Sequence, residues 1–376
     1  MTHAWGRGLR WLLAVGVMSG LLAACGGNGE AEPTATTAPV ATATTAAAAT
    51  TTDLSAMKGY SLDRAAEMKT ATAALAEDAA SFYADAEAAD FDYQAMFDAD
   101  PEGIAALLAK TKQDWIAAST AYEQNEGIIA GVPSLSYYDV WIDAGPSGEE
   151  DATGALDWQL ELPNGETLDK PGNFFHNLTE PAIWGTDDDF VGLRADLDQD
   201  GTQELGEVMP EANIFKAATE GLDAATAEMT GAINDWEPTP EDAFTALVVM
   251  IPTMNEYFEQ WKLSVFVAGA QETEEVAFVA LSRLFDINGI LAGLDLTYDQ
   301  LSTNVTTADS GLDAQIQEGF ETLIGHVGDL YQQEADGKHF TADEADVFGS
   351  EAQDQATQLA GQVSQAAALL GVAVAE

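Results

Sequence analysis

The residues best suited to chemistry lie near the middle of the chain, in residues 174–185, which read FFHNLTEPAIWG. His176, one of only four histidines, is followed four residues later by Glu180. On a helix these two side chains lie on the same face. An imidazole beside a carboxylate is part of a typical transition-metal site. The pair also fits an amphipathic helix with a buried, hydrogen-bonded histidine, so by itself it leaves both interpretations open.

Two further segments carry carboxylates that can contribute to the same site. Glu123 and Glu126 are three residues apart in an expected helix, which places them on one face. Asp143 lies in an aromatic segment, YYDVWIDAG at residues 137–145, where a buried carboxylate is costly unless a cation neutralises it. One imidazole with several carboxylates suits iron, manganese or zinc better than copper. For the glutamate pair, a solvated helix face is the alternative interpretation.

A separate metal signal lies in residues 196–207, DLDQDGTQELGE, which match the twelve-residue EF-hand loop. Aspartates, a turn glycine and a final glutamate occupy the positions that the loop requires. The expected calcium ligands are Asp196, Asp198, Asp200, Thr202 through its carbonyl, Glu204 and Glu207. Because the motif has no second copy in the chain, we expect a lone structural calcium site. An acidic turn without an ion is the alternative.

The overall composition limits the partners that the protein can have. Asp and Glu number 64 against 13 Lys and Arg, which gives a formal net charge of −51. Such a surface repels phosphates, so we exclude nucleic acid and anionic lipid as partners, whereas metal cations are attracted. The single cysteine, Cys25, excludes internal disulfides, iron–sulfur clusters and cysteine-based zinc sites.

The N-terminal residues predict export and lipid anchoring. Residues 1–24 combine Arg7 and Arg10 with an apolar run too short to span a bilayer comfortably, as in a signal peptide. The run ends in LAAC, which resembles a bacterial lipobox and predicts lipidation of Cys25. Residues 25–52 then form an expected Ala/Thr-rich, flexible tether. We therefore expect an extracytoplasmic, membrane-anchored lipoprotein at the cell surface or in the periplasm; an ordinary secretory signal is the alternative.

From about residue 53 onward, apolar residues recur at three- and four-residue steps, the pattern of amphipathic helices. The expected helices cover residues 60–90, 101–130, 211–235, 240–269, 273–302, 312–335 and 341–373. An irregular region over 131–173 contains an expected hairpin near 158–165. Long helices with short joints predict antiparallel bundles. We expect an all-α domain over 53–376, with one lobe over about 53–235 and a second over about 236–376.

Several of these segments carry a resemblance to a known family. YEQNE at 122–126, the Ile-Asp pair at 142–143 and FHNLTEPAIWG at 175–185 resemble the imelysin-like family, in particular its EfeO/EfeM branch of extracytoplasmic iron-uptake proteins. Residues 284–293 and 340–346 resemble two later family segments. The resemblance implies two packed four-helix-bundle lobes with a metal site in a cleft. The ligands that it implies are Glu123, Glu126, Asp143, His176 and Glu180.

Two departures from the family pattern concern the site. The family spaces its histidine and glutamate as His-x-x-Glu, whereas three residues separate His176 from Glu180 here. Because Pro181 follows and disfavours a plain helix at Glu180, we expect a π-bulge or kink. The family's Tyr-Ser-His-Thr-Asp segment reads FVALS at residues 278–282, without its histidine.

The leading functional hypothesis is a lipid-anchored protein that binds a transition metal, iron according to the resemblance, and passes it to a membrane partner in iron transport. Such a protein captures a cation and turns over no substrate. A calcium-stabilised surface-binding or scaffold protein is the first alternative, because the irregular region is rich in aromatic residues. A metallopeptidase is the second, since the family takes its name from a proteolytic member, although the His-Glu-x-x-His motif of zinc peptidases is absent here.

Overall fold

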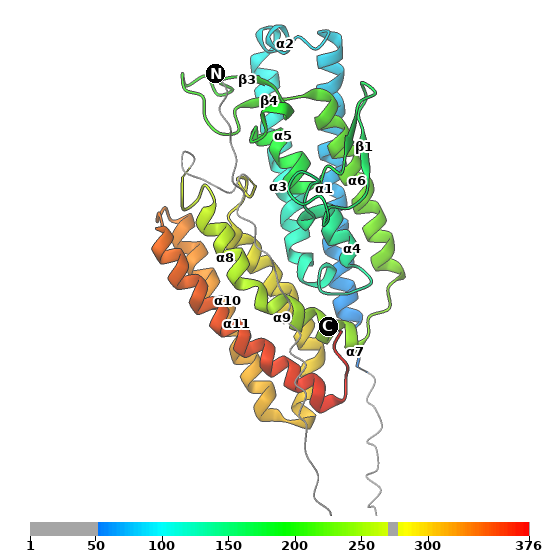
Figure 1. Ribbon diagram of the computed structural model, residues 1–376, viewed down its shortest axis with the longest axis vertical. Helices are drawn as coiled ribbons and strands as arrows, with labels where there is room; N and C mark the ends of the chain where they lie inside the picture. Colours follow the sequence, from blue (N-terminus) through cyan, green and yellow to red (C-terminus); the bar gives the residue numbers. More distant parts are fainter. Residues whose placement is uncertain (1–51, 270–276, 376) are drawn as a thin grey trace, which may run out of the picture. The chain divides into compact units, whose positions relative to one another are not determined.

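The computed structural model describes residues 52–269 and 277–375 (Figure 1). The predicted signal, Cys25 and the tether up to residue 51 lie outside the described residues. Within the described part, long helices dominate and the strands form only two short hairpins, so the predicted all-α class is confirmed. None of the described helices combines the length and the apolar character that a membrane-spanning segment requires.

A first group of helices packs around α1 (Ser55–Ala88). The short helix α2 (Tyr93–Ala99) leads into α3 (Pro101–Ile129), which contacts α1 along its length, and α6 (Ala212–Asp235) also packs against α1 (Figure 1). Short elements from residues 136–184 contact both α3 and α6 in place of a fourth long helix. The first bundle is therefore closed by the segment that contains the predicted metal ligands.

This closing segment is irregular, as predicted for residues 131–173, and two of its turns are π-helical. They are η1 (Val140–Ala144) and η2 (Phe175–Thr179), and η2 continues directly into α5 (Glu180–Trp184). Between them, the expected hairpin is formed by β1 and β2, which pair in antiparallel register. The remaining short elements up to α6 are α4 (Ser136–Asp139), β1 (Gln159–Glu161), β2 (Thr167–Asp169), η3 (Asp188–Phe190), β3 (Val191–Arg194) and β4 (Val208–Pro210).

A second group of helices follows α6 in the chain. Its members are α7 (Pro240–Met250), α8 (Met254–Leu263), α9 (Arg283–Ala308), α10 (Ser310–Ala335) and α11 (Ala342–Leu370). The single helix expected over 240–269 is wrong, because it is interrupted by the 3-10 turn η4 (Ile251–Thr253), where Pro252 lacks the amide that a continuous helix needs. The broken helix α7–α8 packs against α9 and α11, and α10 packs against the same two helices.

Local capping explains where most helices begin. Thr239 and Thr341 start α7 and α11 with capping boxes, in which a threonine hydroxyl and a carboxylate three residues later satisfy free amides. One predicted start is wrong, since α9 begins at Arg283 and not near Thr273. Ser282 caps α9, and the amides just before Ser282 bind a side chain of the site described below.

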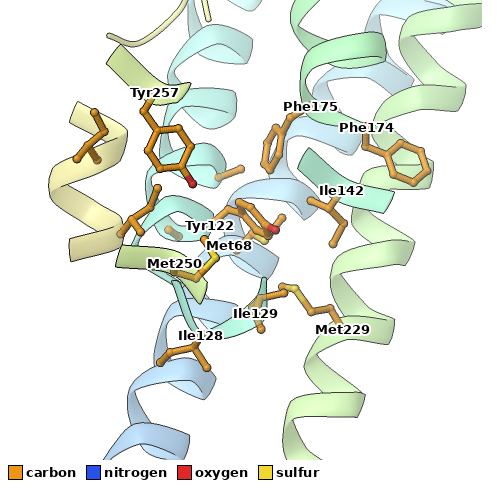
Figure 2. Packing of buried hydrophobic residues seen from close by; sticks show 14 of the residues in the cluster. Met68, Tyr122, Ile128, Ile129, Ile142, Phe174, Phe175, Met229, Met250 and Tyr257 are labelled. Carbon is orange, nitrogen blue, oxygen red and sulfur yellow. The ribbon is translucent and has the colours of Figure 1, made fainter. Parts of the chain in front are cut away.

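The two groups of helices contact each other along α3 and α9. A glycine permits this close approach, since a Cβ atom on Gly293 would lie only 2.7 Å from the carbonyl oxygen of Gln124. Figure 2 shows the apolar core beside the contact, where Met68 of α1, Tyr122 of α3 and Tyr257 of α8 converge. The polar side chains of the site described below lie beside this core.

Candidate metal centre

Three elements bring four of the predicted ligand residues together. Glu123 and Glu126 come from the last turns of α3, Asp143 from η1 and His176 from η2, and all four are at most 8% exposed. Potential ligand atoms of Glu123, Asp143 and His176 lie within 4.8 Å of one another, and so do those of Glu126, Asp143 and Asp139, which ends α4. The structure thus gathers carboxylates and an imidazole from distant segments, as the sequence predicts.

A cavity of about 440 Å³ opens onto Glu126, Asp143 and His176 of this group. Residues that line it include Glu126, Asp139, Asp143, His176, Tyr257 and Arg283. Because a water molecule takes up about 30 Å³ in the liquid, the cavity has room for an ion together with several waters. A metal ion can therefore reach the buried donors.

The extra residue between His176 and Glu180 is accommodated by the π-helical turn, as predicted. The amide of Thr179 donates to the carbonyl of Phe174, five residues earlier, at 2.9 Å. The Thr179 hydroxyl donates to the same carbonyl at 2.8 Å and accepts a hydrogen bond from Trp115 Nε1 at 2.8 Å. The widened turn leaves the two site side chains in contact, with His176 Nδ1 2.8 Å from Glu180 Oε2.

Asn173 connects the two π-helical turns. Its Oδ1 accepts a hydrogen bond from the His176 amide at 2.6 Å, and its Nδ2 donates to the carbonyl of Gly145, just after η1, at 3.0 Å. This link holds Asp143 and His176 in register, with His176 Nε2 3.1 Å from Asp143 Oδ1. The sequence analysis did not single out Asn173, although its place three residues before His176 is typical of a capping side chain.

Glu180 occupies a different place from the one predicted, because it lies behind the imidazole and not among the converging ligand atoms. Its Oε1 accepts the amides of Val279 and Ala280 at 2.8 and 2.9 Å, and its Oε2 accepts the amide of Phe278 at 3.0 Å as well as the imidazole. Four donors use the acceptor capacity of this fully buried carboxylate. Glu180 therefore orients His176, which directs Nε2 toward Asp143 and the cavity.

A comparison with known protein families assigns the chain to a family. The family model described as Imelysin (peptidase M75) matches residues 56–370, which include every element of the site. The chain belongs to the imelysin family. The comparison with curated proteins gives no match. In this imelysin-family chain, the segment that lacks the family's histidine supplies the three amides to Glu180, and the Phe278 ring lies 4.1 Å from the His176 ring.

Three donors of this imelysin-family site, Glu123, Glu126 and His176, have pKa values shifted toward their protonated forms. Burial raises the pKa of Glu126 to about 7, and burial with the neighbouring carboxylates raises that of Glu123 well above its usual range. Burial alone lowers the pKa of His176, but the charges of Asp143 and Glu180 outweigh this effect and raise it to about 10. A metal ion that binds here must therefore displace protons.

Two charged residues that the sequence analysis left out of the site lie next to the ligands. Arg283 Nη1 lies 3.0 Å from Asp286 Oδ2 and 3.8 Å from Glu123 Oε2, and all three side chains are at most 3% exposed. The guanidinium also lies 4.0 Å from the centre of the Phe278 ring. The spacing of Arg283 and Asp286 on one helix face was the available signal, and their ion pair lies beside the carboxylates of the site without adding net charge.

The predicted calcium loop lies between β3 and β4, so two strands flank it instead of the two helices of an EF-hand. Potential ligand oxygens of Asp196, Asp198 and Glu207 lie within 4.8 Å of one another. Asp200 accepts hydrogen bonds from the amide and the hydroxyl of Thr202. Among the described residues, neither Asp200 nor Glu204 belongs to that group of oxygens. Calcium binding stays a prediction, with an acidic turn as its alternative.

Proposed function

We propose that this protein captures a transition-metal ion, with iron as its cargo, in the buried cavity. The observation that carries the proposal is the convergence of Glu123, Asp143 and His176. Glu123 Oε2 and Glu126 Oε2 are buried and have no hydrogen-bond partner among the described residues. A carboxylate buried in this way is costly unless it is protonated or neutralised by a cation.

Capture exchanges protons for the metal ion. Glu180 retains the Nδ1 proton of His176, so Nε2 is the nitrogen that becomes a ligand once its own proton leaves. Glu123 and Asp143 supply negative charge that offsets the charge of the ion. Three protein ligands leave coordination positions for water or for a group on a receiving partner. The site can therefore release its ion without a rearrangement of the three protein ligands.

The expected pH dependence tests this proposal. The metal-free site binds more protons than the loaded site, because the pKa of His176 is raised to about 10 and that of Glu123 well above its usual range. Affinity for Fe(II), Mn(II) or Zn(II) should therefore rise between pH 6 and pH 8, about tenfold per pH unit for each proton released. Calorimetric titration of chelator-treated protein, with Fe(II) handled without oxygen, measures this slope. Failure of all three ions to bind would end the proposal.

The location of the protein is part of the same proposal. The lipobox-like end of the predicted signal and the resemblance to the EfeO/EfeM branch support a lipoprotein anchored at Cys25, outside the cytoplasm, that delivers iron to a membrane partner. Replacing Cys25 by alanine should move the protein from the membrane fraction to the soluble fraction. Equal membrane retention of both forms would contradict lipid anchoring at this residue.

A peptidase function has weaker support from the site. The family description names a peptidase group, and zinc peptidases of the His-Glu-x-x-His type use two histidines one helical turn apart. The other histidines of this chain are His3, His326 and His339. Among the described residues that line the cavity, His176 is the single histidine, so the pair that this type of peptidase uses is not found there.

A further inference from the structure

We propose that the cavity holds a pair of metal ions bridged by the carboxylate of Asp143. This inference rests on the function proposed above and adds a second ion to it. Asp143 belongs to both groups of converging ligand atoms. Glu123 and His176 complete the first position, and Glu126 and Asp139 complete the second.

The spacing of the two glutamates on α3 suits such a pair. Glu123 and Glu126 are three residues apart on α3, which at 1.5 Å per residue corresponds to a step of about 4.5 Å along the helix. Metal ions that share a bridging ligand in two-metal sites lie about 3.5–4 Å apart. Each ion therefore has its own glutamate from α3, and Asp143 lies between the two positions.

The ligands of the second position have unused acceptor capacity. Glu126 Oε1 accepts the hydroxyl of Tyr257 at 3.0 Å, but Glu126 Oε2 is buried without a hydrogen-bond partner in the described part of the chain. The side chain lines the cavity, and the residue is only 4% exposed. Asp139 Oδ1 accepts the hydroxyl of Tyr122 at 2.8 Å. The tyrosines thus fix one oxygen of each carboxylate and leave the other for an ion.

The charge of the ligands is also compatible with two ions. When ionised, the four carboxylates of the two positions carry four negative charges, and His176 is neutral as a ligand. The charge of Arg283 is already paired with Asp286. With one divalent ion, two of these carboxylates would keep their protons, whereas a second divalent ion can displace those protons. Two divalent ions balance all four, and the volume of the cavity accommodates both with bound water.

Manganese(II) is a suitable probe because it prefers carboxylate ligands and gives an electron paramagnetic resonance spectrum. The full-length, chelator-treated chain would be loaded with Mn(II) in excess calcium, which keeps the acidic loop at 196–207 from taking up manganese. Elemental analysis after gel filtration should then find two Mn(II) per chain. The spectrum should show spin coupling, because bridged ions interact magnetically whereas separate ions do not.

Three variants assign the positions. Glu126→Gln and Asp139→Asn should each lower the content to one Mn(II) and abolish the spin coupling. Glutamine keeps an acceptor for the Tyr257 hydroxyl, and circular dichroism checks that each variant is folded. Glu149→Gln is the matched control, since Glu149 is exposed and is not among the residues that line the cavity, and it should retain two coupled ions.

The manganese content and the spin coupling together test the bridged pair. One uncoupled Mn(II) in the wild-type chain would overturn the bridged pair and leave the single-ion function standing, whereas no bound Mn(II) would overturn both. Two coupled ions in both Glu126→Gln and Asp139→Asn would overturn the assignment of the second position. The wild-type spectrum alone tests the pair, even if a variant fails to fold.

Discussion

Replacing His176 by alanine should weaken binding of Zn(II) or Fe(II) by about a hundredfold or more. Loss of a residue that merely orients a ligand costs about 10–100-fold in metal affinity, and loss of the ligand should cost at least as much. The imidazole is the nitrogen donor of the group that contains Glu123 and Asp143. Its removal leaves two carboxylates and water, a weaker set for these metals than one with an imidazole. Calorimetric titration near pH 8 measures the change.

His326→Ala is the matched control for this prediction. His326 lies on α10, where its Nε2 is 3.3 Å from the carbonyl of Phe348 and its ring stacks on Phe258. This variant should bind metal with wild-type affinity. If both histidine variants retain wild-type affinity, the assignment of the metal to the cavity is wrong.

Glu180→Gln should reduce both stability and metal affinity. The fully buried carboxylate accepts three backbone amides and the imidazole. A glutamine presents one oxygen and one NH₂ group, so donors on one side would face another donor. We expect unfolding to become easier by about 3–5 kcal/mol, the typical result of removing one member of a buried charged network. Metal affinity should fall about 10–100-fold because the imidazole loses its orientation.

Urea unfolding and metal titration of Glu180→Gln and Glu149→Gln test both effects. Glu149 is exposed, and the substitution removes the same charge from the surface. A stability loss equal in the two variants would show that general charge reduction is responsible. If stability falls but the affinity of the folded Glu180→Gln protein is unchanged, Glu180 serves the fold and does not orient the ligand.

The fold could be predicted largely from local signals. Helical periodicity and capping residues act over a few positions, so the ends of α3 and α6 fall within about two residues of the expected ones. The break at Pro252 and the late start of α9 were missed. In the second case the amides before Arg283 bind Glu180, which is about a hundred residues away in sequence.

The site could be predicted only in part, for the same reason. The resemblance to the family named Glu123, Asp143 and His176, which the structure brings together. Which residues converge on the site depends on tertiary packing. Glu180 lies behind the imidazole and Asp139 lines the cavity, and their spacing in the sequence could not predict this difference. Both carboxylates are one helical turn from a ligand, yet only the fold determines which of them reaches the cavity.

The π-helical turn at residues 175–179 makes the direction of the His176 imidazole depend on the length of this segment. Successive residues of an α-helix are rotated by about 100° around the helix axis. Deleting one residue of the turn would therefore rotate His176 by roughly that angle relative to α5, although all the candidate ligand residues would remain in the sequence. Variants made by substitution keep this spacing and cannot reveal its contribution. Relatives with the same donors and a different number of intervening residues must direct the imidazole by another backbone geometry.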